Sequence, residues 1–177
     1  LRGRWRLGAL VTAMLGRFLR HAFTPPLALR RAFPPATLAA IDAAVAANEA
    51  RTRAEIRVAV EAALGLGQLW AGTTARERAI EVFGQLRLWD TAANNGVLLY
   101  VLLAEHDIEI VADRALADRV PAAALAAVCA DLQAAYRRGD YRDGTVAAVT
   151  ALGELAAPHF PAQGPNPNEL PDTTVLL

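Results

Sequence analysis

Asn95-Gly-Val-Leu-Leu-Tyr-Val-Leu-Leu103 gives the clearest indication of the fold in this sequence. Residues 97–103 carry no charge and are rich in Val, Leu and Tyr, which favour strands. An apolar run without alternation is typical of a strand that is covered on both faces. The turn sequence at residues 90–96 fixes where this strand begins. We therefore expect a central β-strand between layers of helices.

Two further strands are expected beside the central one. Residues 55–61 alternate between large apolar side chains and polar or small ones, which predicts a half-buried strand. The short turn at 104–107 and the apolar run at 108–111 predict the second arm of a hairpin. These three strands form a small sheet.

Helical periodicity dominates the rest of the chain, at residues 5–20, 38–48, 74–88, 121–138 and 144–157. Thr73 or Thr74 is the expected N-cap of the helix 74–88. In that helix we expect Ile80, Phe83 and Leu86 to face inward and Glu77, Arg78, Glu81 and Arg87 to face water. The fold class is therefore α/β: a small mixed β-sheet sandwiched between α-helices, in a single domain with an N-terminal amphipathic helix.

The domain organisation follows from composition. Residues 1–30 form a basic amphipathic N-terminal helix, and residues 31–157 form the α/β domain. Residues 158–177 are rich in Pro and show no helical period. We expect this tail to be extended, and either to pack on the body or to stay mobile.

Charge is unevenly distributed along the chain. All 18 basic side chains are Arg; residues 1–31 hold seven of them and no acid, whereas residues 32–177 hold 11 Arg against 18 acids. The net charge of zero gives no global field for nucleic acid, so no nucleic-acid partner is expected.

The helix at 5–20 allows more than one interpretation. It packs on its own domain or on a second subunit, or it is an interfacial helix drawn to anionic lipid by its Arg residues. A degenerate targeting segment is the third interpretation. For the interfacial helix, the expected membrane-binding residues are Trp5, Arg17 and Arg20.

Residue usage excludes several catalytic classes. The chain has no Ser, which excludes a serine nucleophile, and no Lys, which excludes a Walker A motif. Cys129 is the one cysteine, so an internal disulfide and a Cys-based zinc site are excluded. Cys129 lies in a helical pattern and is read as a small core residue, the alternative being a reactive thiol.

A set of short motifs occurs in a fixed order along residues 31–155: Phe33-Pro34, Thr52-x-x-Glu55-Ile56-Arg57-Val58-x-Val60, Phe83, Asn95-Gly96-Val97-Leu98-Leu99, Ile108-Glu109-Ile110-Val111 and Gly139-x-Tyr141-x-x-Gly144. In order and spacing these motifs resemble the TPM domain family, named for a thylakoid lumen protein, a photosystem II repair protein and a nematode receptor modulator. The resemblance implies a sheet sandwiched by helices.

The Arg-rich N-terminal helix and the Pro-rich tail look like a compact bacterial subgroup of this family. That subgroup lacks the usual signal peptide and C-terminal transmembrane anchor. No small-residue cleavage site of a signal peptide follows the apolar run in the helix at 5–20. Together with the resemblance, this leads us to expect a cytoplasmic protein that is peripheral to the inner membrane.

The resemblance also implies candidate chemistry. Some relatives are described as acid phosphatases, some bind calcium, and others act as assembly or modulatory partners of membrane proteins. Oxygen ligands at strand ends suit Ca²⁺ or Mg²⁺, and the candidates are Asp90, Asn94, Asn95 and Asp113. Arg114 is the candidate phosphate clamp.

Two features at these positions favour a simpler interpretation. The family often has Asp where this chain has Asn95, and a Gly-rich turn where this chain has residues 112–115. Asp90 then caps a turn, and Asn94-Asn95-Gly96 supplies positive φ.

The sequence is therefore compatible with two functions. The first is a non-enzymatic binding or assembly domain that works with protein or membrane-surface partners. The alternative is a divalent-metal-dependent, acid phosphatase-like hydrolase. Whether the protein is an enzyme, and its oligomeric state, stay open at this stage.

Overall fold

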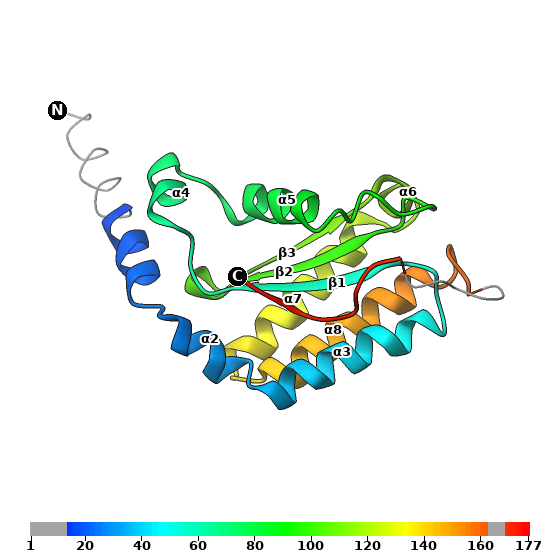
Figure 1. Cartoon of the computed structure of the whole chain (residues 1–177), viewed down its shortest axis with the longest axis horizontal. Coiled ribbons are helices and arrows are strands. Elements are labelled where there is room, and N and C mark those ends of the chain that lie inside the picture. Colours follow the sequence, from blue (N-terminus) through cyan, green and yellow to red (C-terminus); the bar gives the residue numbers. More distant parts are fainter. Residues whose placement is uncertain (1–13, 163–168) are drawn as a thin grey trace.

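The computed structural model describes residues 14–162 and 169–177. In this part of the chain a sheet of four strands lies between helical layers, in the order β3-β2-β1-β4 (Figure 1). β1 and β2 are parallel, β3 returns antiparallel to β2, and β4 is parallel to β1. The strands are β1 (Ile56–Glu61), β2 (Val97–Leu102), β3 (Asp107–Ala112) and β4 (Val175–Leu176).

The long helices α3, α7 and α8 lie on one side of the sheet, and α5 covers the other side (Figure 1). A further helical stretch spans residues 14–22. The remaining bounds are α2 (Pro26–Ala32), α3 (Pro35–Glu49), α4 (Leu66–Ala71), α5 (Ala75–Gln85), η1 (Leu103–Glu105), α6 (Arg114–Ala117), α7 (Ala122–Arg137) and α8 (Tyr141–Ala156). The expected α/β sandwich is confirmed.

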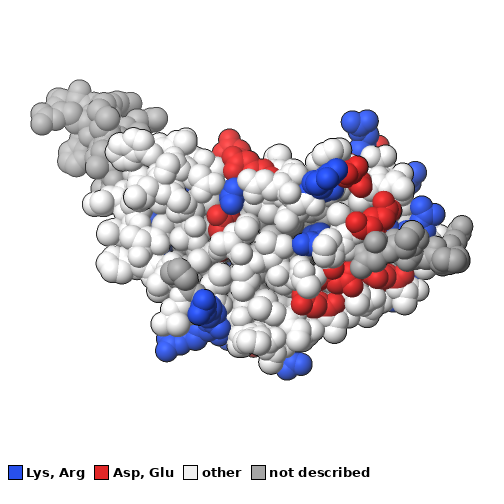
Figure 2. Space-filling model, in the orientation of Figure 1, with Lys and Arg blue, Asp and Glu red and all other residues white. Residues whose placement is uncertain are grey.

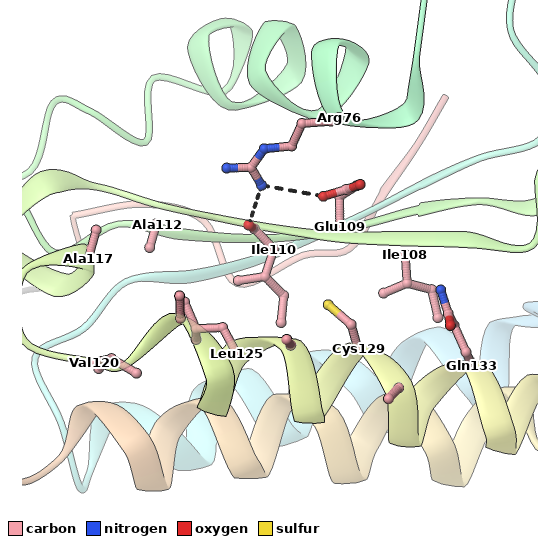
Figure 3. A pocket seen from close by; sticks show the side chains of 13 residues that line it. Arg76, Ile108, Glu109, Ile110, Ala112, Ala117, Val120, Leu125, Cys129 and Gln133 are labelled. Carbon is pink, nitrogen blue, oxygen red and sulfur yellow. Dashed lines mark hydrogen bonds and ion pairs between the residues drawn. The ribbon is translucent and has the colours of Figure 1, made fainter.

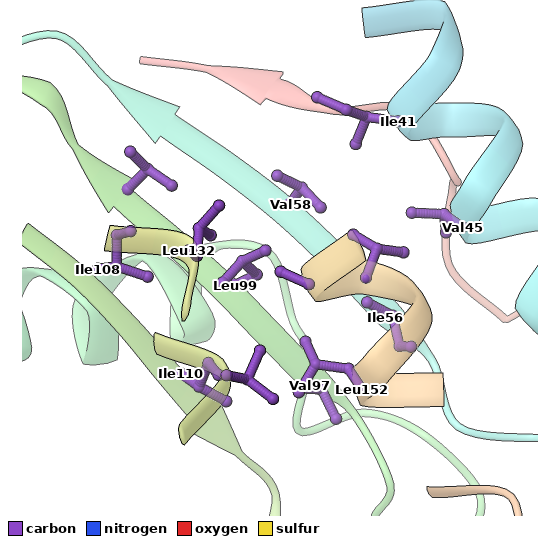
Figure 4. Close-up of a cluster of buried hydrophobic side chains, with 14 of the residues drawn as sticks. Ile41, Val45, Ile56, Val58, Val97, Leu99, Ile108, Ile110, Leu132 and Leu152 are labelled. Atoms are coloured by element: carbon purple, nitrogen blue, oxygen red, sulfur yellow. The ribbon is translucent and has the colours of Figure 1, made fainter. Parts of the chain in front are cut away.

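β2 is the central strand that its sequence predicts, and it is buried along its whole length. Val97, Leu99 and Val101 join the core beneath α3, α7 and α8, part of which is shown in Figure 4. Leu98 and Tyr100 join a second core beneath α5. Both faces of the strand are therefore apolar, which is why its sequence shows no alternation.

The prediction of a half-buried β1 is wrong, because all six of its residues are buried. The face that was expected to meet water carries Arg57 and Glu61, and both find partners inside the protein. Arg57 donates a hydrogen bond to the Pro171 carbonyl, and Glu61 is bound by Arg78. Internal partners make burial of these charges possible.

The N-cap predicted for α5 is confirmed, and its predicted orientation is correct in part. The hydroxyl of Thr74 accepts a hydrogen bond from the Glu77 N–H. As expected, Phe83 and Leu86 pack against the core beneath α5, and Glu77, Glu81 and Arg87 are exposed. The prediction is wrong at Ile80, which is 52% exposed, and at Arg78, which turns to the sheet and binds Glu61. The fully buried residues of the helix are Ala75, Ala79 and Val82.

The described part of the tail adds a strand that the sequence did not reveal. Val175 and Leu176 pair with Ala59 and Val60 of β1. A two-residue strand is too short to show a periodic pattern, so sequence inspection could not find it. No helix in residues 14–162 or 169–177 is long and apolar enough to cross a membrane.

Candidate functional site

The loops before β1 and β2 and the loop after β3 meet at one end of the sheet. This follows from the register, in which Val97 pairs with Ile56 on one side and with Ala112 on the other. The Asp113 N–H donates to the Gly96 carbonyl over 2.8 Å. The structure therefore brings the predicted residues Asn95 and Asp113 into one loop cluster.

Two oxygens in this cluster are buried without a hydrogen-bond partner among the described residues: Asn95 Oδ1 and Asp113 Oδ2. The other polar atoms of these side chains are satisfied. Asn95 Nδ2 donates to the Arg53 carbonyl over 2.6 Å, and Asp113 Oδ1 accepts from the Arg114 N–H over 2.7 Å as the N-cap of α6. Buried oxygens without partners are uncommon and mark this cluster as a candidate site.

The other predicted ligands are directed elsewhere. Asp90 is exposed and its carboxylate binds Arg87 over 2.5 Å. Asn94 is exposed with a φ of 49°, whereas Asn95 and Gly96 do not have positive φ, so the turn interpretation is confirmed only at Asn94. The described residues contain no group of three or more His, Cys, Asp or Glu side chains that could hold a metal ion. The four predicted ligands thus do not assemble into one set, and Ca²⁺ or Mg²⁺ binding stays a prediction.

A small basic cavity adjoins the cluster, and sequence reasoning did not find it. Its volume is about 320 Å³, and its lining includes Arg53, Arg119 and His159. The Arg119 guanidinium lies 5.2 Å from the centre of the Phe160 ring. These residues come from distant parts of the chain, so no sequence spacing could have joined them. Arg114, the predicted phosphate clamp, is exposed on α6.

The helical stretch 14–22 is held to the domain by polar contacts at the other end of the sheet. Arg17 Nε donates to Glu105 Oε1 over 2.5 Å, and its Nη2 donates to the Thr73 carbonyl. His21 Nε2 lies 2.6 Å from Glu105 Oε1, and His21 Nδ1 accepts from the Leu64 N–H over 2.9 Å. Burial acts to raise the pKa of Glu105, but the bonds from His21 and Arg17 hold it below its ordinary value.

Large apolar side chains are exposed around this stretch, and we call them the apolar end surface. Trp70 of α4 is 79% exposed, and its ring meets Phe18 edge-on with centres 5.7 Å apart. Figure 2 shows this end as mostly uncoloured, with basic side chains grouped below it. The members of the surface are Met14, Leu15, Leu19, Phe23, Leu27, Leu66 and Trp70.

Basic residues lie on the same elements as the apolar end surface. Arg20 is exposed on the stretch 14–22, and Arg30 and Arg31 are exposed in the last turn of α2. Trp5, the third expected membrane contact beside Arg17 and Arg20, lies outside the described residues. Exposed apolar side chains on adjacent elements beside basic residues make this end a candidate interaction surface.

Comparison with known proteins identifies relatives of this chain. A family model described as the TPM domain matches residues 29–155. The NMR structure of the BA42 protein from the psychrophilic bacterium Bizionia argentinensis is 27% identical, with a TM-score of 0.71, over 80% of this chain and 92% of that one.

A second solution structure, of the N-terminal domain of a protein from P. gingivalis, supports the fold alone. It is 17% identical, with a TM-score of 0.57, over 71% of this chain and 77% of that one. A search of curated proteins found no match.

Proposed function

This chain belongs to the TPM domain family, and from that premise we propose that it is a non-enzymatic binding and assembly domain that docks on an anionic membrane surface. The apolar end surface is the observation that carries the proposal. Its members come from the stretch 14–22, the start of α2, and α4, so three separate elements expose large apolar side chains at the same end.

Exposed apolar side chains favour insertion at a membrane interface. Removing one large apolar side chain from water contributes about 1.5–3 kcal/mol when its burial is complete. Trp70 and Phe23 suit the interface because aromatic rings enter the boundary between headgroups and acyl chains. Several such side chains on adjacent elements give a shallow, reversible anchor.

The basic residues around this surface supply the electrostatic part. Each Arg near an anionic leaflet contributes about 1 kcal/mol, and Arg20, Arg30 and Arg31 are all exposed. Arg17 has a structural role instead of contacting lipid, because its guanidinium already binds Glu105 and the Thr73 carbonyl. It orients the stretch 14–22 so that the apolar side chains face outward.

The alternative, a divalent-metal-dependent, acid phosphatase-like hydrolase, has less support from the geometry. Asn95 Oδ1 and Asp113 Oδ2 offer two buried oxygens, and Arg53 and Arg119 offer positive charge nearby. However, Asp90 is bound by Arg87, and the described residues do not gather enough ligands around an ion.

The test is co-sedimentation with vesicles, comparing a phosphatidylglycerol-containing membrane with pure phosphatidylcholine. We expect binding to the anionic vesicles, and a loss of about tenfold or more in affinity for Trp70→Asp. Trp89→Asp is the matched control, because Trp89 is 53% exposed but lies outside the apolar end surface, and we expect it to bind like the wild type. Arg20→Glu should weaken binding most at low salt.

Failure of the wild-type protein to bind anionic vesicles would contradict the membrane proposal. Equal binding by Trp70→Asp and Trp89→Asp would also contradict it. The same preparations can be assayed with a generic phosphomonoester and Mg²⁺. Turnover that disappears in Asp113→Ala would support the hydrolase instead.

A further inference from the structure

β3 is the edge strand of the described sheet, and one half of its backbone groups faces away from β2. The Asp113 N–H, just past the strand, bonds to Gly96, which places the odd-numbered residues in the ladder with β2. In an antiparallel pair the alternate residues turn outward. Ile108, Ile110 and Ala112 therefore present their N–H and C=O groups to the outer side.

The same residues line a cavity of about 500 Å³ between β3 and α7 (Figure 3). The side chains of Leu125 and Cys129 lie across from them on α7. On the opposite face of the strand α5 contributes Arg76 and, one turn further on, the exposed Ile80. The free edge of β3 is thus bordered by apolar side chains on both sides.

Among the described residues, the outward-facing backbone groups of Ile110 bond to side chains and not to another strand. Arg76 Nη1 donates to the Ile110 carbonyl over 2.6 Å. The Ile110 N–H donates a hydrogen bond to the Cys129 sulfur, which is a weak acceptor. A carbonyl oxygen has two lone pairs, so Ile110 retains capacity for a second donor.

The edge of β3 carries one positive and one negative side chain, an arrangement that suits pairing with a second copy of the chain. Arg76 lies 3.4 Å from Glu109, so the edge carries one charge of each sign close to Ile110. Edge strands that avoid pairing often carry like charges that repel another strand. Here a second copy, reversed by a two-fold axis, would set its Glu109 near Arg76 and its Arg76 near Glu109.

We propose that two copies of this chain pair antiparallel along β3, about a two-fold axis at Ile110. Ile108 then lies opposite Ala112 of the partner subunit, and each Ile110 carbonyl accepts the Ile110 N–H of the other subunit. The sheet continues through the dimer, Ile80 becomes covered, and the charged pairs form between subunits. This inference goes beyond the proposed function and does not depend on it.

Sedimentation velocity over about 10 µM to about 1 mM covers the range of weak dimers and tests association directly. We expect the wild type to move from monomer to dimer as its concentration rises. A monomer at every concentration overturns the proposal, including the case in which this edge instead takes a peptide from another protein.

A charge exchange tests the face. Arg76→Glu and Glu109→Arg should each weaken association by about tenfold or more, because each sets like charges against one another across the axis. The double variant Arg76→Glu/Glu109→Arg should restore it. Arg138→Glu is the matched control, since Arg138 forms an exposed ion pair with Asp140 away from β3. Association that persists in both single variants overturns the proposal.

Hydrogen exchange on the wild-type chain tests the register and does not depend on any variant folding. The amides of Ile108 and Ala112 should exchange more slowly as the concentration rises, because they enter the inter-subunit ladder. The Glu109 amide belongs to the ladder with β2 and should not respond. Equal behaviour of Ile108 and Glu109 overturns the proposed pairing.

Discussion

Glu61 lies at the end of β1, beneath α5, where it accepts hydrogen bonds from two other side chains. Its Oε2 accepts from the Tyr100 hydroxyl over 2.6 Å and from Arg78 Nε over 2.8 Å. Arg78 Nη2 reaches Oε1 over 3.2 Å, so the Arg–carboxylate contact uses both oxygens. Burial, followed by the bond to Glu61, raises the pKa of Tyr100, so this hydroxyl remains a donor.

We expect Glu61→Ala to lower the free energy of unfolding by about 3–5 kcal/mol, because it leaves the Arg78 guanidinium and the Tyr100 hydroxyl without an acceptor. Tyr100→Phe is the comparison, since it removes one hydrogen bond and should cost about 1–2 kcal/mol. Urea denaturation measures both. Equal losses in the two variants would show that the carboxylate is not the centre of the network.

The surroundings of the Cys129 thiol determine its reactivity. Burial, with the nearby charge of Glu109, raises the pKa of the Cys129 thiol to about 11. A thiol that stays protonated at neutral pH is a poor nucleophile. Cys129 therefore behaves as the small packed residue that its helical pattern indicates.

At the scale of elements, α3 and α8 approach each other closely, and glycine at position 153 permits it. A Cβ at Gly153 would come within 2.0 Å of Asn48 Oδ1. Asn48 is buried, and its Nδ2 donates to the Val149 carbonyl over 2.9 Å, which joins the two helices. Any side chain at position 153 would disturb this hydrogen bond.

Gly153→Ala should therefore destabilise the protein by about 1–3 kcal/mol, the usual cost of overpacking. Gly84→Ala is the matched control, because Gly84 lies in α5 and a Cβ there would meet nothing within 4 Å. That change should stabilise by about 0.5–1 kcal/mol, since alanine loses less backbone freedom than glycine on folding. Thermal unfolding distinguishes the two, and a shift in the same direction for both would contradict the packing argument.

At the scale of the whole molecule, the segment 169–177 ties the end of the chain to α3 and β1. Arg57 donates to the Pro171 carbonyl, and the Thr174 hydroxyl donates to Asp42 Oδ1 over 2.7 Å. Val175 and Leu176 then complete the sheet as β4. The segment thus fixes the outer edge of β1.

Carboxyl groups are crowded where this segment crosses the chain. Glu49 at the end of α3 faces Asp172, with Glu55 nearby. Burial, then the hydrogen bond to Asp172, then the charges of Asp172 and Glu55 raise the pKa of Glu49 to about 7. Burial also raises the pKa of Glu55. Burial lowers the pKa of Arg57, against the opposing effect of the nearby charges of Asp172, Asp42 and Glu55.

The sign of the pH dependence follows from these shifts. Between pH 4.5 and about 7 the folded chain holds a proton on Glu49 that the unfolded chain releases. Stability is therefore lost as the pH rises through this window. We expect the urea midpoint to fall between about pH 5 and about pH 8, and to fall less in Glu49→Gln.

Glu154→Gln is the control for this prediction, because Glu154 is exposed on α8 and, among the described residues, forms an ion pair with Arg51 away from Glu49. It should keep the wild-type pH profile. If Glu49→Gln also keeps that profile, the carboxyl pair between α3 and the segment 169–177 does not set the pH dependence.

Neighbouring residues encode the local elements of this protein. The uncharged run of β2, the hairpin to β3, the Thr74 cap and the helical periods at 38–48, 74–88, 121–138 and 144–157 are local signals, and the structure has these elements at those places. Of the helix predicted at 5–20, residues 5–13 lie outside the described residues. In the candidate site the sequence indicated Asn95 and Asp113, because turn chemistry and strand ends can be read locally.

Contacts between residues far apart in the chain appear only in the folded protein. Arg17 meets Glu105 across 88 positions, and Arg57 meets Pro171 across 114, and no local pattern encodes either contact. For the same reason the sequence could not show that Arg53 and Arg119 share a cavity, or that the end of the chain adds a strand to β1. Periodicity reports which face of an element is apolar, whereas burial of a charged residue depends on the partner that folding brings to it.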